Sequence, residues 1–333
     1  MYQTFFKSVS LSLAALFFCS TNVFCMEQDP LPSWNEGAVK SAIIRFVEEA
    51  TEEKGANYIA PAARIATFDQ DGTLWVEKPL YPQWYFTVER LGDLASSPFS
   101  KFTKFVKNIL NKIRMTPDVS KQELTHLLAV IDEDTSIEGF HDVVGKWLAN
   151  SSHPDFKRPF TSLIYQPMLE ALKLFQNNGF KTYIVSGGGQ EFIRAYAEDF
   201  YQIPPEWVIG SAVKVKYENS DGKIDLKRTP SILYVNEKEG KPEAINLIIG
   251  RKPVVAFGNS DGDRQMLEQT WANKGLAVLI HHDDQLREYA YDSDSFIGKL
   301  TEEFMEEAKE RNYQVVSMKE DWHLLFPWQL ALP

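Results

Sequence analysis

The chain has 333 residues, of which 44% are hydrophobic, enough for a large core. Its formal net charge of −11 at pH 7 disfavours nucleic acid or an anionic membrane as the main partner. This length predicts one core domain with a sizeable insertion.

Residues 1–25 have the layout of a secretory signal peptide. Lys7 is their only charged residue, the apolar run extends from Val9 to Phe18, and a polar stretch leads to Cys25. This layout predicts cleavage near Met26 and an exported protein, periplasmic or secreted, without stable membrane association afterwards. An uncleaved membrane anchor is the alternative, although the apolar run is short for a bilayer span.

Both cysteines, Cys19 and Cys25, lie within this segment. The mature chain would therefore have no disulfide, no thiol nucleophile and no thiolate metal site.

The chain that follows begins with a helix and a strand and then becomes helical. Helical spacing of apolar residues predicts a helix from Ser33 to Lys54, and the apolar run Ile65 to Phe68 predicts a buried strand. Residues 77–160 lack strand alternation, so we predict a helical cap inserted between the two parts of an α/β core, residues 26–76 and 161–333. The cap helices are expected at Pro82–Leu94, Phe99–Arg114, Lys121–Ile131 and Ile137–Ala149.

Strands and helices alternate in the second part of the core, which predicts an α/β fold with a doubly wound, mostly parallel sheet. The expected elements are a helix at Pro167–Asn177, a strand at Lys181–Val185, a helix at Gln190–Phe200, strands at Trp207–Gly210 and Ala212–Tyr217, a hairpin partner at Lys223–Lys227, a helix from Lys241, and strands at Pro253–Phe257 and Leu276–Ile280.

Two acids, Asp69 and Asp71, directly follow the strand Ile65 to Phe68. Open α/β sheets keep their ligand crevices at this edge, so the position favours a binding site. The two carboxylates repel each other, and Mg²⁺, which prefers oxygen ligands, would relieve that repulsion. A simple surface turn is the alternative, because Asp-Gly is a common turn dipeptide.

Three further places can reach the same edge of the sheet. Ser186 and the three following glycines offer a hydroxyl and backbone N–H groups to an anion, or else form only a tight turn. Lys241 opens a helix and could neutralise a carboxylate or a phosphoryl group. The polar loop Gly258 to Asp263 follows a strand and contains oxygen ligands for Mg²⁺.

In this order, the motifs D-Q-D-G-T, S-G-G-G, G-K-P and G-N-S-D-G-D resemble those of the haloacid dehalogenase superfamily, phosphatase branch. The resemblance is closest to phosphoserine-phosphatase-like members, whose helical cap follows the first motif, and it extends from Ile65 to about Ile280. It implies a Rossmann-like core with a helical cap.

The resemblance also implies roles for individual residues. Asp69 would be the nucleophile that forms an aspartyl-phosphate, and Asp71 the general acid and base. Lys241 would offset charge on Asp69 and the phosphoryl group, and Ser186 and the amide of Gly187 would hold the phosphoryl oxygens. The implied Mg²⁺ ligands are Asp69, Asp71 through its backbone carbonyl, Asn259 and Asp263.

Asn259 departs from the family pattern, in which a metal-binding aspartate stands at this position. The amide removes one negative charge, so Mg²⁺ would be held less tightly unless Asp261 or Asp263 compensates. The presence of Asp71 favours phosphate ester cleavage over carbon–halogen cleavage, because an alkoxide leaving group needs a proton and a halide does not.

We therefore predict an Mg²⁺-dependent phosphomonoesterase for small phosphorylated metabolites. A phosphotransferase that uses the same intermediate and a catalytically weak phosphate-binding relative are the alternatives.

Two other clusters are open to more than one interpretation. An aromatic group at the start of the cap is expected to pack at the cap hinge, with a choline-like cation bound by cation–π contacts as the alternative. The run from His281 to Asp284 lacks further ligands at zinc-like spacing and is expected to be a surface loop. The aromatic group consists of Trp75, Tyr81, Trp84, Tyr85 and Phe86.

Overall fold

The computed structural model of the chain describes residues 29–96, 133–291 and 293–331. The predicted signal peptide and the predicted cap helices at 99–114 and 121–131 lie outside these residues. Among the described helices, none is both long and apolar enough to cross a bilayer.

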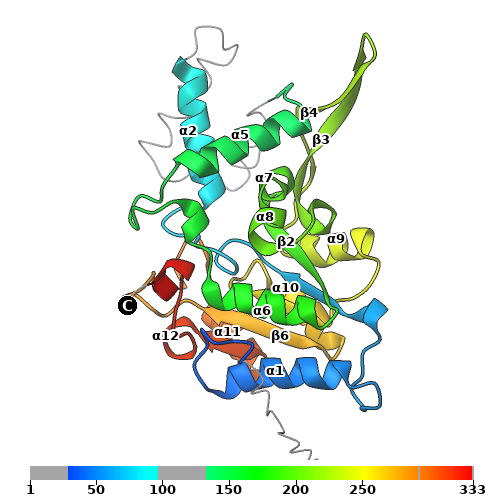
Figure 1. Cartoon of the computed structure of the whole chain (residues 1–333), viewed down its shortest axis with the longest axis vertical. Coiled ribbons are helices and arrows are strands. Elements are labelled where there is room, and N and C mark those ends of the chain that lie inside the picture. The colour runs from blue at the N-terminus through cyan, green and yellow to red at the C-terminus, as the bar shows by residue number, and fades with distance from the viewer. Residues whose placement is uncertain (1–28, 97–132, 292, 332–333) are drawn as a thin grey trace, which may run out of the picture.

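The described elements form one sheet of seven strands with flanking helices (Figure 1). The helices are α1 Ala38–Thr51, α2 Pro82–Ser96, α5 Ile137–Asn150, α6 Gln166–Asn177, α7 Gln190–Arg194, α8 Ala197–Tyr201, α9 Gly240–Ile248, α10 Arg264–Ala272, α11 Glu302–Glu310 and α12 Met318–Asp321, with short 3₁₀ turns at Pro61–Ala63, Phe160–Ser162, Pro205–Trp207 and Pro327–Ala331. The strands are β1 Ile65–Phe68, β2 Lys181–Gly189, β3 Val208–Ser220, β4 Lys223–Tyr234, β5 Val255–Gly258, β6 Leu276–His281 and β7 Gln314–Ser317.

The strand order is β4-β3-β2-β1-β5-β6-β7, and every neighbouring pair is parallel except β3 and β4. Successive side chains of a strand point to opposite faces. Accordingly, Phe68 and Phe257 belong to the apolar cluster on one face, where α1 and α6 pack, whereas Ile65 and Ala256 belong to the cluster that α9, α10 and α11 cover. The predicted α/β, doubly wound sheet is thus confirmed.

Helices α2 and α5 stand above the sheet, beside the long β3–β4 hairpin (Figure 1). Their positions agree with helices expected there, but the boundaries of the cap at residues 77–160 stay a prediction. The hairpin is larger than expected, because the two short strands predicted at 207–217 form one strand. Register shifts near Ala212 and Val213 bend this strand away from the core, as β-bulges do.

Three other expectations differ from the structure. The helix predicted at Gln190–Phe200 is interrupted, because Tyr196 leaves the helical conformation at φ −142° and its ring packs against Trp75 at 5.0 Å. Helix α1 begins only at Ala38, since the backbone and hydroxyl of Ser33 bond to Glu170. Strand β7 was not predicted, and it extends the sheet beyond β6.

Trp322, in the C-terminal segment, packs into the hydrophobic core. Its side chain is fully buried and contacts the rings of Trp34 at 5.7 Å and Tyr165 at 5.5 Å. Removing a fully buried Trp side chain leaves a cavity, so Trp322→Ala is expected to lower the free energy of unfolding by about 3–5 kcal/mol. Trp271→Ala is the matched control, because Trp271 is 42% exposed and should lose about 1 kcal/mol or less. Equal losses for the two variants in urea denaturation would contradict the role of Trp322.

Candidate active site

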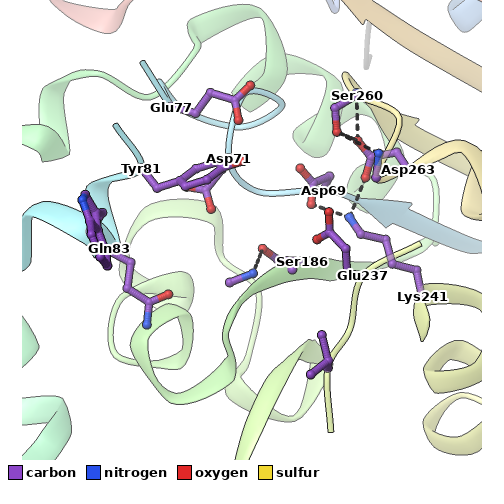
Figure 2. Close-up of a pocket in the computed structure, with 15 residues that line it drawn as sticks. Asp69, Asp71, Glu77, Tyr81, Gln83, Ser186, Glu237, Lys241, Ser260 and Asp263 are labelled. Carbon is purple, nitrogen blue, oxygen red and sulfur yellow. Dashed lines mark hydrogen bonds and ion pairs between the residues drawn. The ribbon is translucent and has the colours of Figure 1, made fainter. Parts of the chain in front are cut away.

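The carboxyl ends of three adjacent parallel strands meet at one edge of the sheet. Strand β1 lies between β2 and β5, so the last residues of β2 are brought together with the residues that follow β1 and β5. Figure 2 shows that they surround one cavity. Its lining residues are Asp69, Asp71, Glu77, Tyr81, Gln83, Trp84, Ser186, Gly187, Gly188, Val235, Glu237, Lys241, Ser260, Gly262 and Asp263.

The ammonium of Lys241 forms hydrogen bonds with residues from all three of these strands and their following loops. This residue lies in the first turn of α9, before Pro242, and only 1% of it is exposed. Its Nζ lies 2.6 Å from Asp69 Oδ1, 2.5 Å from Asp263 Oδ1 and 2.8 Å from the carbonyl oxygen of Val185. The structure therefore contains the predicted contact between Lys241 and Asp69.

Two carboxylates around one ammonium leave a residual repulsion. Burial raises the pKa of Asp69 well above its usual range, and the charge of Asp263 raises it further, despite the opposing effect of Lys241. For Lys241, burial lowers the pKa, but the charges of Asp263 and Asp69 outweigh burial and raise it. The ammonium therefore stays charged, and it holds one oxygen of Asp69 while the other is left for chemistry.

Asp71 is placed to exchange protons. Its Oδ1 accepts a hydrogen bond from Trp75 Nε1 at 2.7 Å. Burial raises the pKa of Asp71 to about 6, while the bond from Trp75 and the charge of Lys241 oppose the rise. A carboxyl with a pKa near neutrality suits general acid and base catalysis.

The residues predicted to bind an anion lie in the last part of β2, which continues to Gly189 beyond its predicted end at Val185. Ser186 and Gly187 both line the cavity, and Ser186 Oγ accepts a hydrogen bond from Gly188 N at 3.0 Å. A Cβ at position 187 would lie 2.1 Å from Glu237 Oε2, so a larger residue there would displace the Glu237 carboxylate. Gln83 of α2 contacts this end of β2, because its Oε1 accepts a bond from Gly189 N at 2.8 Å.

The loop after β5 contains two aspartates, of which Asp263 lines the cavity and Asp261 does not. The carboxylate of Asp263 accepts from Lys241, from the amides of Asn259 and Ser260, and from the Ser260 hydroxyl. Three of these donors share Oδ2, whereas Oδ1 accepts only from Lys241. Asp261 accepts from the amide and hydroxyl of Thr301 and is not among the residues that line the cavity.

Several cavity residues were not predicted as site residues. Tyr81 and Trp84 belong to the aromatic group noted in the sequence, whereas Glu77, Gln83 and Glu237 carried no motif signal. Glu77 is 2% exposed and accepts a hydrogen bond from Asn259 Nδ2 at 2.6 Å. Burial raises the pKa of Glu77 well above its usual range, and the charges of Asp71 and Asp69 raise it further.

The aromatic group divides between packing and the cavity. Trp75 and Phe86 are buried, and the Phe86 ring contacts Phe140, Trp147 and Phe192 between α2, α5 and α7. This part packs at the base of α2, as expected. Tyr81 and Trp84 line the cavity, so a cation–π role for these two rings stays open.

The prediction of a surface loop at 281–284 was wrong for His282 and Asp284, because these residues are buried, at 1% and 3% exposure. The imidazole of His282 lies between two oxygens, with Nε2 2.7 Å from the carbonyl oxygen of Gly72 and Nδ1 3.1 Å from Glu288 Oε2. A stacked Tyr291 ring covers it at 4.0 Å. No local pattern could have indicated this contact, because its partner, Gly72, is remote in the chain.

The charges around the cavity suit a hard cation. Its lining contains five carboxylates and one ammonium, so an anionic substrate would meet an excess of negative charge. Oxygen donors of this kind fit Mg²⁺. Asp69 and Asp71 line the cavity, whereas Asn259 lies behind the lining, with its amide bonded to Thr73 and Glu77. Within residues 29–96, 133–291 and 293–331, no group of three or more His, Cys, Asp or Glu side chains is arranged as a metal site. The predicted ligand set stays a prediction.

Comparison with known proteins defines the class. The sequence profile of the haloacid dehalogenase-like hydrolases matches residues 66–268, more than half of the chain. The chain therefore belongs to the haloacid dehalogenase-like hydrolase family. No curated protein matches it.

Solved structures with a similar arrangement include a conserved functionally unknown protein from Anaerococcus prevotii DSM 20548, with 16% identity, coverage of 87% of this chain and 94% of that one, and a TM-score of 0.54. A protein of unknown function from Bordetella pertussis Tohama I has 15% identity, coverage of 77% and 98%, and a TM-score of 0.47. A phosphoserine phosphohydrolase-like protein from Francisella tularensis subsp. tularensis SCHU S4 has 24% identity, coverage of 65% and 87%, and a TM-score of 0.36. At these identities, the likeness concerns the fold alone.

The pairing of Lys241 with two carboxylates can be tested through stability. Lys241→Met leaves Asp69 and Asp263 buried without their cation, so the free energy of unfolding at pH 7 should fall by about 3–5 kcal/mol. Without the ammonium, the pKa of Asp69 rises further above its unfolded value. Protonation then favours the folded state, and the deficit should shrink as the pH falls from 7 to about 4.

Lys252→Met is the control, because Lys252 is exposed and its replacement should cost about 0.5 kcal/mol or less at either pH. Urea denaturation at both pH values measures the difference. A deficit of Lys241→Met that does not change with pH would contradict this account of the charges.

Proposed function

We propose that the protein is an Mg²⁺-dependent phosphomonoesterase that hydrolyses small phosphorylated metabolites through an aspartyl-phosphate. The observation that carries the proposal is the convergence of Asp69, Asp71, Ser186 and Lys241 on one cavity, with Lys241 Nζ 2.6 Å from Asp69 Oδ1. Membership of a hydrolase family supports a reaction with water.

In the first step, a carboxylate oxygen of Asp69 attacks phosphorus, and the bond between phosphorus and the ester oxygen breaks. Protonated Asp71 donates its proton to the leaving alkoxide, which departs as an alcohol. Ser186 and the amide of Gly187 hold the phosphoryl oxygens, and Lys241 offsets negative charge on Asp69 and the transferring group.

In the second step, the Asp71 carboxylate accepts a proton from water while the water oxygen attacks phosphorus. The bond between phosphorus and Asp69 breaks, which releases inorganic phosphate and restores both carboxyl groups. An Mg²⁺ ion bound by Asp69, the backbone carbonyl of Asp71 and the Asn259 amide, with Asp263 as a further candidate, would supply electrostatic stabilisation of the phosphoryl oxygens.

The proposal includes the setting in which the enzyme works. We propose export, on the basis of the first 25 residues, and phosphorylated small molecules rather than nucleic acids as substrates, on the basis of the acidic chain.

The nucleophile can be tested with p-nitrophenyl phosphate and Mg²⁺. Asp69→Asn should lower kcat by at least about 10³-fold, because a neutral amide cannot form the acyl phosphate. Lys252→Met serves as the folded control with an unchanged cavity. Wild-type protein without activity on a panel of phosphate esters would contradict the phosphatase proposal, and a new glycerol phosphate ester formed in the presence of glycerol would indicate phosphotransfer.

The pH dependence tests Asp71 as the acid. Its pKa of about 6 means that the protonated form is lost as the pH rises through that value, so kcat/KM for an alkyl phosphate should fall above pH 6. p-Nitrophenyl phosphate, whose leaving group needs little protonation, should show a weaker fall. Asp71→Asn should lower kcat/KM for the alkyl phosphate about 10²–10⁴-fold and remove this pH limb. Identical profiles for the two substrates would argue against Asp71 as the acid.

A further inference from the structure

The loop after β5 offers little negative charge to a cation. Asn259 is neutral, and the charge of Asp263 is already shared by the Lys241 ammonium at Oδ1 and by three donors of its own loop at Oδ2. Asp261 is engaged by Thr301, away from the cavity lining. A divalent cation beside Asp69 would therefore lack the second carboxylate that the family pattern places at position 259.

The side chain of Glu77 lies where that charge is missing. Its Oε1 is 2.6 Å from Asn259 Nδ2, it lines the same cavity as Asp69, and it is 2% exposed. Among the described residues, this bond from Asn259 is the only hydrogen bond of its carboxylate, and no Lys, Arg or His forms an ion pair with it. The charged form of a buried carboxylate with one neutral partner is costly, so a cation bound beside Glu77 would stabilise it.

The backbone is shaped to admit the pair. Gly72 has φ +76°, and a Cβ on it would lie 2.2 Å from both Glu77 Oε1 and Asn259 Nδ2. His282 fixes the same residue through its contact with the Gly72 carbonyl oxygen. The close packing at Gly72 therefore leaves room for the side chains of Glu77 and Asn259 to contact each other. Figure 2 shows Glu77, Asp71 and Asp69 among the side chains that line the cavity.

We propose that Glu77 is the anionic oxygen ligand of the divalent cation, and that it replaces the carboxylate which the loop after β5 lacks at Asn259. The inference rests on the proposed Mg²⁺ dependence. It assigns the negatively charged ligand to Glu77, after the D-Q-D-G-T motif, and not to position 259 in the G-N-S-D-G-D motif. The ligand class is a hard cation, Mg²⁺ or a similar ion, held by carboxylate and amide oxygens.

The test is a charge relocation measured by isothermal titration calorimetry with MgCl₂ on the chelator-treated protein. Glu77→Gln should weaken Mg²⁺ binding by about 10–100-fold, and the second change Asn259→Asp should restore it to within about threefold of wild type, because it returns the carboxylate to the other side of the pair. Glu237→Gln is the matched control, since it removes one negative charge from the same cavity. It should change the dissociation constant by about threefold or less.

Wild-type affinity in a folded Glu77→Gln variant would overturn the inference, and so would a loss that Asn259→Asp does not rescue. If Glu77→Gln does not fold, the Asn259→Asp variant tests the inference through its Tm with and without Mg²⁺. Its two facing carboxylates should lower Tm in EDTA, and Mg²⁺ should raise Tm more than in wild type, whereas an equal rise overturns the inference. Absence of Mg²⁺ binding by the wild type would overturn both the inference and the metal dependence, but hydrolysis independent of Glu77 with intact Mg²⁺ binding would overturn the inference alone.

Discussion

The ammonium of Lys241 lies between two buried carboxylates and a backbone carbonyl, and the arrangement of the cavity depends on it. Its three acceptors are Asp69 directly after β1, Val185 within β2, and Asp263 in the loop after β5. Buried carboxylates without a cation would be strongly unfavourable, so this contact joins the sheet edge to α9 as well as orienting Asp69, the proposed nucleophile. Stability and reactivity thus rest on the same group.

The remaining charge of the cavity is negative, which is unusual for a site that we propose to bind phosphate esters. One ammonium cannot balance five carboxylates and a phosphoryl group. Burial and mutual repulsion leave Asp71 with a pKa near 6, which is useful for proton transfer, but the same repulsion would oppose substrate binding. A divalent cation would reconcile the two demands, and Glu77 beside Asn259 offers it a place.

The substrate side of the cavity is tied to the helices above the sheet. Gln83 of α2 accepts from the Gly189 amide at the end of β2, and Tyr81 and Trp84 from the same segment line the cavity. The β3–β4 hairpin contacts the start of α5 through a bridge between Ser136 and Lys227. For the proposed phosphatase, substrate selection would therefore depend on residues outside the core motifs, in agreement with motifs that define a family and leave the substrate undetermined.

The sequence alone determined the alternation of strands and helices, the sheet type and the approach of Asp69, Asp71, Ser186 and Lys241, because parallel strands deliver their following turns to one edge. Local pattern could not reveal contacts made over long separations. Glu77 with Asn259, His282 with Gly72 and the donors that occupy Asp263 depend on how the loops fold back. The broken helix at Tyr196 and the bulged β3 likewise follow from tertiary packing and pairing, which override local propensity.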